Sequence, residues 1–315
     1  MKRTRDRQSG VAAVTAVLVV AIAASAASIM LAQQSATLDQ ARLIASRAQA
    51  DQYALAGLDW ARGVLDADAQ SAGNVDSLDE GWAQPIVGLP VERAMVAGAI
   101  ADEQGKLNLN NLVVNNVKND AAVKAFRQLL ASLGLAPELA DAVVDWIDAD
   151  SDLSGPGGAE DAYYLSLAKP YRAANSPMVQ VEELYRVRGF DAATVAKLKP
   201  YVTALHDAGT NQMTVAIPVN VNTASPLVLA ALMPDMPQGK IDAFVAARTK
   251  QPMKTLKQLE DWTHGLANGT NGLHIQSSYF SVRIRVAQDD VQLASDALLV
   301  RKGNTVSVAW RRPIY

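Results

Sequence analysis

Five carboxylates lie in one short segment near the middle of the chain, WIDADSDLSGPGGAED. Asp148, Asp150 and Asp152 alternate with other residues, and Glu160 and Asp161 follow a glycine-rich bend. Carboxylate oxygens at this spacing suit a hard cation such as calcium, which takes about six to eight oxygen ligands. The segment, called the acidic loop below, is therefore a candidate calcium site.

The acidic loop is not an EF-hand. Counted from Asp148, an EF-hand needs glycine at its sixth position and glutamate at its twelfth, where this chain has Leu153 and Ala159. The residues alone leave two interpretations open, a cation site or a solvated loop whose carboxylates cap helices. A carboxylate-pair hydrolase would need one acid buried and protonated beside an ionised one. Nothing in the pattern indicates such burial, and no nucleophile accompanies it, so we predict that the protein is not an enzyme.

The composition removes several other chemistries. The chain contains no cysteine, which excludes disulfides, thiolate metal sites and cysteine nucleophiles. Its three histidines, His206, His264 and His274, lack the spacing of metal ligands. The formal net charge of −3 gives no case for a broad nucleic-acid surface.

The start of the chain determines where everything else is placed. A basic leader, MKRTRDRQSG, precedes an uncharged apolar run at Val11–Ala32. A run of this length can cross a bilayer core, which needs about 20 helical residues. The basic leader should stay cytoplasmic, so the rest of the chain is expected on the far side. Three interpretations remain: a secretory signal cleaved near Ala24–Ala26, a simple signal anchor, or a prepilin-like leader cut after Gly10 to leave Val11 as the N-terminus.

The segment after the apolar run favours the prepilin-like interpretation. Gln33–Gln70 contains no proline and is rich in Ala, Leu, Gln and Arg, which are good helix formers. We predict one helix from Val11 to about Leu65, roughly 80 Å long. A pilin-like stalk needs such a continuation, whereas a cleaved secretory signal does not. The spacing predicts one apolar face, formed by Leu38, Ala41, Ala45, Ala48 and Leu55.

Strand patterns occur on both sides of a helical middle. After the loop-like stretch Ser71–Pro90, the segment Arg93–Leu112 predicts a strand pair or hairpin arm with a turn near Glu103–Gly105. Ser277–Gln288 alternates apolar and polar residues, and two further strands flank a Gly303-Asn304 turn. The pattern predicts an α+β fold in which a long N-terminal helix carries a small antiparallel, pilin-like sheet interrupted by a large helical insertion.

The predicted organisation has four parts. They are a leader at 1–10, a transmembrane and stalk helix at 11–66, a body formed by 67–112 with 275–315, and an inserted helical domain at 113–274. Val181–Val202 and Thr223–Arg248 each predict helix, turn and helix. The insertion is therefore expected to be SAM-like or helix-hairpin-helix-like and to contain two small bundles, roughly 113–205 and 206–274.

The segment Val219–Trp262 resembles a helix-hairpin-helix module, a fold shared with DNA-binding competence proteins. In the DNA-binding versions the hairpin is glycine-rich, so that backbone N–H groups approach a phosphate closely. Here the turn Met233–Lys240 has one glycine, two prolines and an aspartate, although Lys240, Arg248 and Lys250 are basic. A structural helix pair without nucleic acid is favoured. The alternative is a membrane-tethered DNA-binding protein of competence type.

Two regions carry a family resemblance. The leader, Gly10 and the two half-helices after it resemble the N-terminal signal of type IV pilins and type II secretion pseudopilins. WIDADSD, GAEDAYYLSLAKPYRAANSP and VEELYRVRGFD are similar to the most characteristic block of the minor pseudopilin K family, whose inserted domain holds calcium in this loop. The resemblance covers nearly the whole chain and implies structural calcium. The ligands that it implies are Asp148, Asp150, Asp152, Glu160 and Asp161.

The resemblance also implies a location and partners. It predicts a single-pass inner-membrane protein with its C-terminal domain in the periplasm, cleaved after Gly10 by a prepilin peptidase and methylated at Val11. The expected partners are minor pseudopilins I and J of the same secretion system, with which it would cap the pseudopilus tip and help to initiate assembly; no nucleic acid is expected. These families usually carry glutamate at the fifth mature position, and this chain has Thr15 there. Losing that ionisable group removes an intramembrane contact within the fibre, which suits a terminal subunit.

Overall fold

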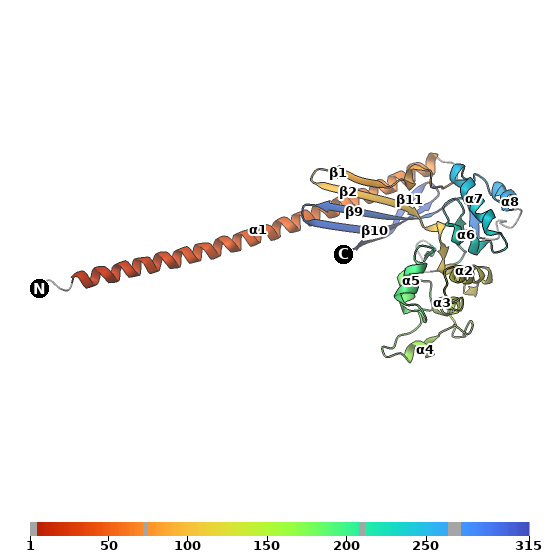
Figure 1. Ribbon diagram of the computed structural model, residues 1–315, viewed down its shortest axis with the longest axis horizontal. Coiled ribbons are helices and arrows are strands. Elements are labelled where there is room, and N and C mark those ends of the chain that lie inside the picture. The colour runs from red at the N-terminus through yellow and green to blue at the C-terminus, as the bar shows by residue number, and fades with distance from the viewer. Residues whose placement is uncertain (1–4, 72–74, 208–211, 264–271, 315) are drawn as a thin grey trace.

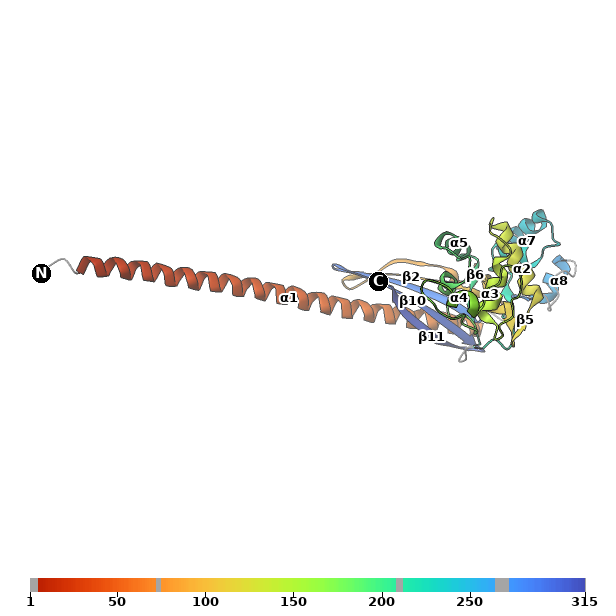
Figure 2. The ribbon, with the colours of Figure 1, turned by 90° about the horizontal axis from the view of Figure 1, so that it is seen from below.

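One long helix carries all the other elements. In the computed structural model, which describes residues 5–71, 75–207, 212–263 and 272–314, helix α1 runs unbroken from Arg5 to Ser71. At about 1.5 Å per residue, its 67 residues extend for about 100 Å. Figures 1 and 2 show that the N-terminal part of α1 stands alone and that its C-terminal part lies along a β-sheet. The single stalk helix is confirmed, and it begins inside the leader rather than at Val11.

The sheet has five antiparallel strands in the order β1-β2-β9-β10-β11. Neighbouring strands follow one another along the chain except β2 and β9, which pair across the long insertion. The α+β fold with an interrupted antiparallel sheet is therefore confirmed. The strands are β1 (Ile86–Val91), β2 (Ala94–Asp102), β9 (Tyr279–Gln288), β10 (Val291–Lys302) and β11 (Thr305–Ile314).

The sheet covers one face of α1. At Gly57 the two come so close that an added Cβ would lie 3.2 Å from the Ile284 side chain on β9. The face predicted from spacing is a different one, because four of its five residues are exposed and Leu55 is only half-buried. Alanine recurs on several faces of α1, so spacing alone does not mark the covered face. The residues that pack against the sheet are Ala50, Ala54, Leu58, Ala61 and Leu65.

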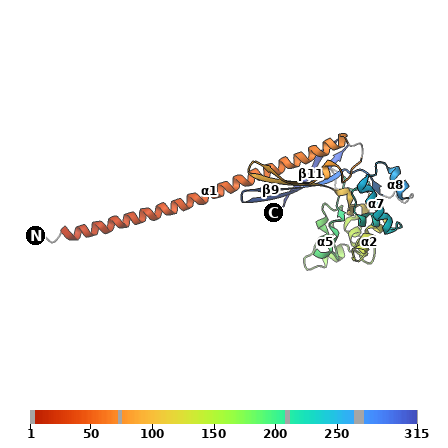
Figure 3. The ribbon, with the colours of Figure 1, turned by 45° about the horizontal axis from the view of Figure 1, so that its top comes forward.

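Between β2 and β9 the chain forms a helical insertion with a core of its own. Figure 3 shows the insertion beside the sheet and beyond the end of α1 that lies far from the N-terminus. Its α-helices are α2 (Asp120–Ser132), α3 (Leu139–Ile147), α4 (Asp161–Leu165), α5 (Ala192–Leu198), α6 (Pro226–Leu232), α7 (Gln238–Lys250) and α8 (Leu256–Thr263).

Short elements connect these helices. Turns of 3-10 helix lie at Gly81–Ala83, Glu103–Gly105, Leu109–Leu112 and Val181–Arg186. Two-residue strands pair as β3 (Leu107–Asn108) with β6 (Val202–Thr203), β4 (Val113–Val114) with β5 (Val117–Lys118), and β7 (Val219–Asn220) with β8 (Leu273–His274).

One strand lies where the sequence predicted a loop. All but the last residue of β1 lie within the stretch 71–90. The chain turns from β1 into β2 at Glu92, which has a positive φ of 49°. The turn predicted near Glu103–Gly105 is present as a buried 3-10 turn, but it ends β2 and does not join two paired strands, because β2 pairs with β1 and β9. β1 contains Gly88 and Pro90, which weaken a strand pattern and are tolerated on an edge strand. Pairing with β2 makes it a strand, and local sequence does not show that pairing.

A buried polar network joins the sheet to the insertion. Asp102, the last residue of β2, accepts hydrogen bonds from Thr223 Oγ1 at 2.6 Å and from Ser277 Oγ at 2.6 Å. It also accepts one from the Gln104 N–H at 2.8 Å. Burial raises the pKa of Asp102 to about 6, although these donors favour the ionised form. Because the donors come from separate segments, the network holds the insertion against the sheet.

Candidate metal centre and membrane anchor

Helix α3 delivers the chain to the acidic loop. The helix is buried almost throughout, since Val143 and Trp146 pack into the core of the insertion. Asp145 is also fully buried, and its Oδ1 accepts a hydrogen bond from the Ser154 N–H at 2.9 Å. The helix ends at Ile147, and the N–H of its C-cap residue, Asp148, donates to the Val144 carbonyl at 2.9 Å. The core packing of α3 therefore fixes where the first carboxylate of the loop begins.

The glycines of the loop let it pass close to α3. An added Cβ at Gly158 would collide with the Asp145 carboxylate, and one at Gly157 would collide with the Glu138 carbonyl. A side chain at either position would push the bend away from the helix. Glycine at these positions therefore lets the chain return and place Glu160 beside the first carboxylates.

Three carboxylates meet where α3 ends. One oxygen each of Asp148, Asp150 and Glu160 lies within 4.8 Å of the other two, a spread that one ion can bridge with ligand distances of about 2.3 to 2.6 Å. Asp148 and Glu160 are only 8% and 6% exposed. In the described part of the chain, several buried oxygens in or beside this group have no hydrogen-bond partner: Asp145 Oδ2, Asp148 Oδ1, Glu160 Oε1 and Oε2, and Asn175 Oδ1.

The surroundings of the group disfavour negative charge on its carboxylates. Burial, followed by the charges of Asp150 and Asp145, raises the pKa of Asp148 to about 7. Burial, followed by the charges of Asp145, Asp148 and Asp150, raises the pKa of Glu160 to about 7. Neighbouring negative charges and loss of water both disfavour the ionised carboxylates. The positive charge of a bound cation would offset both effects.

Two of the five predicted ligands lie outside this group. Asp161 accepts a hydrogen bond from the Ala173 N–H at 3.0 Å and pairs with Arg172 at 3.1 Å. Asp152 is exposed, and its contribution is an N–H that donates to Asp150 Oδ1 at 2.8 Å. The structure thus brings Asp148, Asp150 and Glu160 together, and Asp152 and Asp161 are not part of the cluster.

Two neighbours of the cluster were missed by sequence reasoning. Asp145 lies one helical turn before Asp148, a spacing that puts both on one face and that could have indicated it. Asn175 left no such indication. Its N–H donates to the Trp146 carbonyl at 3.0 Å and its Nδ2 to the Asp150 carbonyl at 3.2 Å. Only folding brings it to the loop.

The group fits a hard cation. All its donor atoms are carboxylate or amide oxygens, which calcium prefers. Buried oxygens without a hydrogen bond are costly unless a ligand satisfies them. Within the described ranges, no lysine or arginine forms an ion pair with Asp148, Asp150 or Glu160. These three residues would hold the ion, and its charge would remove their mutual repulsion.

Helix α1 is the second functional region. Among the described residues it is the helix long and apolar enough to cross a membrane. Its large apolar side chains from Val11 to Leu31 are all more than half exposed. Thr15 Oγ1 lies 2.9 Å from the Ala12 carbonyl and 3.1 Å from the Val11 carbonyl, so its hydroxyl is satisfied inside its own helix. Thr15 therefore needs no polar partner from another chain.

One of the three basic residues of the helix-hairpin-helix segment is buried. Arg248 on α7 is only 7% exposed and donates to the carbonyl oxygens of Val221 and Ala224. Burial lowers the pKa of Arg248 to about 10. Lys240 and Lys250 remain exposed. Arg248 thus braces the start of α6 and is not available to a phosphate, contrary to its grouping with the two lysines above.

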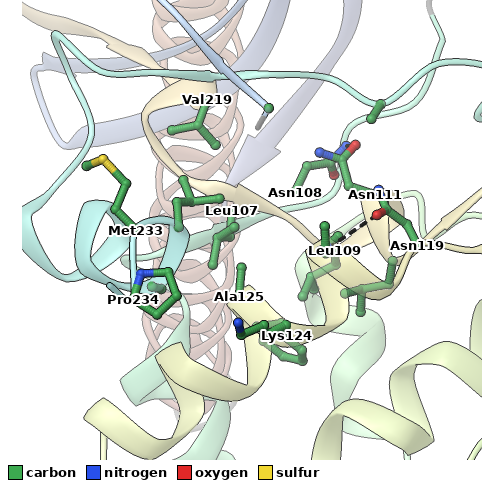
Figure 4. Close-up of a pocket in the computed structure, with 18 of the residues that line it drawn as sticks. Leu107, Asn108, Leu109, Asn111, Asn119, Lys124, Ala125, Val219, Met233 and Pro234 are labelled. Carbon is green, nitrogen blue, oxygen red and sulfur yellow. Dashed lines mark hydrogen bonds between the residues drawn. The ribbon is translucent and has the colours of Figure 1, made fainter. Parts of the chain in front are cut away.

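A cavity of about 280 Å³ lies between α2 and the end of α6 (Figure 4). Its lining is mainly apolar and includes Leu107, Leu109 and Met233. The charged residues among those that line it are Lys124 and Asp235. This lining provides no pair of carboxylates for acid–base chemistry.

Comparison with known proteins agrees with this architecture. Two family models, both described as Type II secretion system (T2SS), protein K, match residues 105–207 and residues 219–283. The type II secretion system protein K of Pseudomonas aeruginosa is 35% identical over 302 residues, covering 91% of this chain and 86% of the relative. That of Aeromonas hydrophila is 31% identical over 328 residues, covering 97% of each chain.

This chain belongs to the type II secretion system protein K family. The resemblance to minor pseudopilin K is thereby confirmed. A chain of the crystal structure of the GspK-GspI-GspJ complex from the enterotoxigenic Escherichia coli Type 2 Secretion System has the same fold, with a TM-score of 0.70 and 24% identity over 88% of this chain and 99% of that one. The ranges matched by the two family models cover most of the insertion and the first half of β9, so the chain matches its family in the part that contains the acidic loop.

Proposed function

We propose that this member of the protein K family caps the periplasmic tip of a type II secretion pseudopilus and helps to initiate its assembly, together with minor pseudopilins I and J of the same system. It acts as a structural subunit and not as an enzyme. α1 anchors it once in the inner membrane, and the sheet and insertion lie in the periplasm. The solved complex that has the same fold contains GspK, GspI and GspJ, which supports the choice of partners.

The position of the insertion carries the tip assignment. The insertion lies beyond the end of α1 that is far from the membrane segment (Figures 1 and 3). A second subunit stacked above this one along the fibre would have to occupy the same space. Thr15 supports the assignment, because its hydroxyl is satisfied within α1 and does not replace the charged contact that the family's usual glutamate makes with a neighbour.

A gold label tests the tip position. The chain contains no cysteine, so a single Tyr185→Cys substitution on the exposed surface of the insertion gives one labelling site. Fibres assembled from the complete set of subunits should carry gold at one end. A cysteine on the major pseudopilin is the matched control and should give gold along the whole fibre. Gold from Tyr185→Cys repeated along the fibre would refute capping.

Processing of the leader is the second part of the proposal. A prepilin peptidase would cut after Gly10 and leave a methylated Val11. Mass spectrometry of the membrane-extracted protein should show loss of residues 1–10 when the peptidase is present, and an intact leader in a Gly10→Leu variant. A mature N-terminus near Ala27, as a secretory signal would leave, contradicts the pilin-type stalk.

Structural calcium in the acidic loop is the third part of the proposal. The unpartnered buried oxygens of Asp148 and Glu160 support it, as does the absence of an ion pair to these residues in the described ranges. Equilibrium dialysis of the full chain in detergent with radioactive calcium should show binding that Asp150→Asn weakens. Equal binding by both proteins would contradict a site in the loop.

A further inference from the structure

A second group of carboxylates lies at the joint between the stalk helix and the head. Asp68 belongs to the last turn of α1, and Asp76 and Glu80 belong to the segment that leads from α1 toward β1. One oxygen from each of the three lies within 4.8 Å of the other two. This joint cluster is distant in sequence from the acidic loop and contains none of its residues.

Asp76 is the most deeply buried member of the joint cluster. Its side chain is 1% exposed. Oδ2 accepts hydrogen bonds from the Ser277 N–H at 2.7 Å and from the Arg301 guanidinium. Oδ1 is buried and has no hydrogen-bond partner in the described ranges. A buried carboxylate oxygen in this state costs free energy unless a further ligand reaches it.

Arg301 neutralises only part of the joint cluster. Its guanidinium pairs with Asp68 Oδ2 at 3.0 Å and with Asp76 Oδ2. Both contacts use Oδ2, so the guanidinium does not occupy the buried Oδ1 of Asp76. Three carboxylates and one guanidinium leave a formal charge of −2 when all are ionised, which one divalent cation would balance.

Glu80 completes the group. Its Oε2 accepts hydrogen bonds from Trp82 Nε1 at 2.5 Å and from the Ser77 N–H at 3.2 Å. Both donors are neutral, so they add no positive charge to the cluster. Both use Oε2, so neither occupies Oε1 of Glu80.

A polar cavity adjoins Asp68 and gives space for waters on that side of the cluster. Its volume is about 230 Å³, and Asp68 is the member of the cluster that lines it, together with residues that include Ser277, Arg301 and Asn304. That volume accommodates several waters, since each takes about 30 Å³ in the liquid. Calcium completes its shell with waters and carbonyl or amide oxygens where carboxylates are few.

We propose that Asp68, Asp76 and Glu80 form a second divalent-cation site, of calcium type, that ties the last turn of the stalk helix to the start of the head. Asp76 Oδ1, which accepts no hydrogen bond from Arg301, is its most buried ligand. The site is independent of the acidic loop and of the tip assignment. Its effect is to fix the angle between stalk and head, because its ligands come from both.

Calcium binding by the full chain in detergent micelles tests the site. The background is Asp150→Asn, which removes a ligand of the acidic loop. In that background, radioactive calcium measured by equilibrium dialysis should still bind at the joint. Adding Glu80→Gln should weaken this remaining binding about tenfold or more, as loss of one charged ligand does. Asp79→Asn, the same charge change at an exposed neighbour outside the cluster, should leave it unchanged.

The opposing interpretation is that Arg301 alone balances the joint cluster. It predicts equal calcium binding with and without Glu80→Gln in the Asp150→Asn background, and that result overturns the proposal. Asp68→Asn gives a second test and should weaken binding as Glu80→Gln does. Melting curves in excess chelator establish that each variant is folded. If either folded variant keeps the full binding of its background, the site is refuted.

Discussion

The acidic loop and the joint cluster both bring three carboxylates together, but they differ in the positive charge that lies beside them. Each brings three carboxylates to within 4.8 Å. At the joint, Arg301 is 11% exposed and forms ion pairs with two of the three acids. In the loop, the described residues supply no such ion pair, and the charge of Lys118 is the smallest of the causes that shift the pKa of Asp148. The joint therefore has a partial internal counter-ion, whereas the loop has none among the described residues.

The buried oxygens without a hydrogen-bond partner differ between the two clusters in the same way. Among the described residues, the joint cluster leaves one such atom, on Asp76, whereas Asp148 and Glu160 in the loop leave three, and the adjacent Asp145 adds a fourth. Like charges placed together in a buried site are tolerated only when opposite charge compensates them. The loop should thus depend strongly on an added ion, and the joint should depend on it weakly for as long as Arg301 is present.

Removing Arg301 should have the largest effect. Arg301→Met keeps an apolar stem to pack on Phe280, over whose ring the guanidinium now lies at 5.0 Å, but leaves Asp76 buried without its counter-ion. Breaking a buried pair in this way costs about 3 to 5 kcal/mol. Thermal melting in chelator should show the loss. Calcium should restore part of it, because the variant cluster has a larger charge deficit.

The control for Arg301→Met is Arg283→Met on the neighbouring strand. Arg283 pairs with Asp296 at 2.6 Å, but its side chain is 54% exposed. Exposed pairs contribute about 1 kcal/mol or less, so this variant should melt close to the wild type. If the two variants lose the same stability, the internal counter-ion has no special role at the joint.

Removing calcium should have the next largest effect, and it should act through the loop. An ion present at about 100 times its dissociation constant stabilises by about 2.7 kcal/mol, which corresponds to a fall in melting temperature of roughly 5 to 10 °C for a head of this size. Chelator should produce this fall in the wild type and in Asp152→Asn, whose carboxylate lies outside the cluster. Asp150→Asn should respond to chelator much less, through the joint cluster alone. An equal fall in the melting temperatures of Asp150→Asn and Asp152→Asn would show that the ion does not bind in the acidic loop.

Asp102 extends the comparison to a buried acid that is satisfied by hydroxyl and N–H donors. Its folded pKa of about 6 lies above its ordinary value, so the folded state binds a proton more readily than the unfolded state. Stability from this group therefore rises as pH falls through about 6 and is lost as pH rises. Between pH 7 and pH 5, the free energy of unfolding of the wild type should gain roughly 1 kcal/mol relative to Asp102→Asn. Denaturation of both proteins at the two pH values measures it, and parallel pH dependence contradicts it.

Sequence reasoning recovered features that depend on local order. The apolar run and the unbroken helix follow from composition and from the absence of proline between Gln33 and Gln70. The alternation in β9 and the Gly303-Asn304 turn indicate the C-terminal strands, and Gly303 does adopt a positive φ of 59°. The acidic loop was found because its carboxylates are close in sequence. The sequence did not show which of these carboxylates share a cluster, since Asp161 forms an ion pair with Arg172 instead.

The stalk face and the joint cluster show what local order cannot supply. Alanine-rich α1 offers several similar faces, and only the approach of β9 at Gly57 selects the buried one. Asp68, Asp76 and Arg301 come from opposite ends of the sequence, so no spacing rule connects them. They meet because β10, which pairs with β9, packs against α1.

By itself, the sequence determined the membrane-length stalk, the strands on either side of a helical middle and the acidic loop, because each depends on residues that are neighbours along the chain. The tertiary structure alone decided which carboxylates meet, which of them have an internal counter-ion, and where the insertion stands relative to the stalk. Those properties depend on strand pairing and core packing across more than two hundred residues. Coulombic interactions act over a few ångströms of space, irrespective of the distance along the chain.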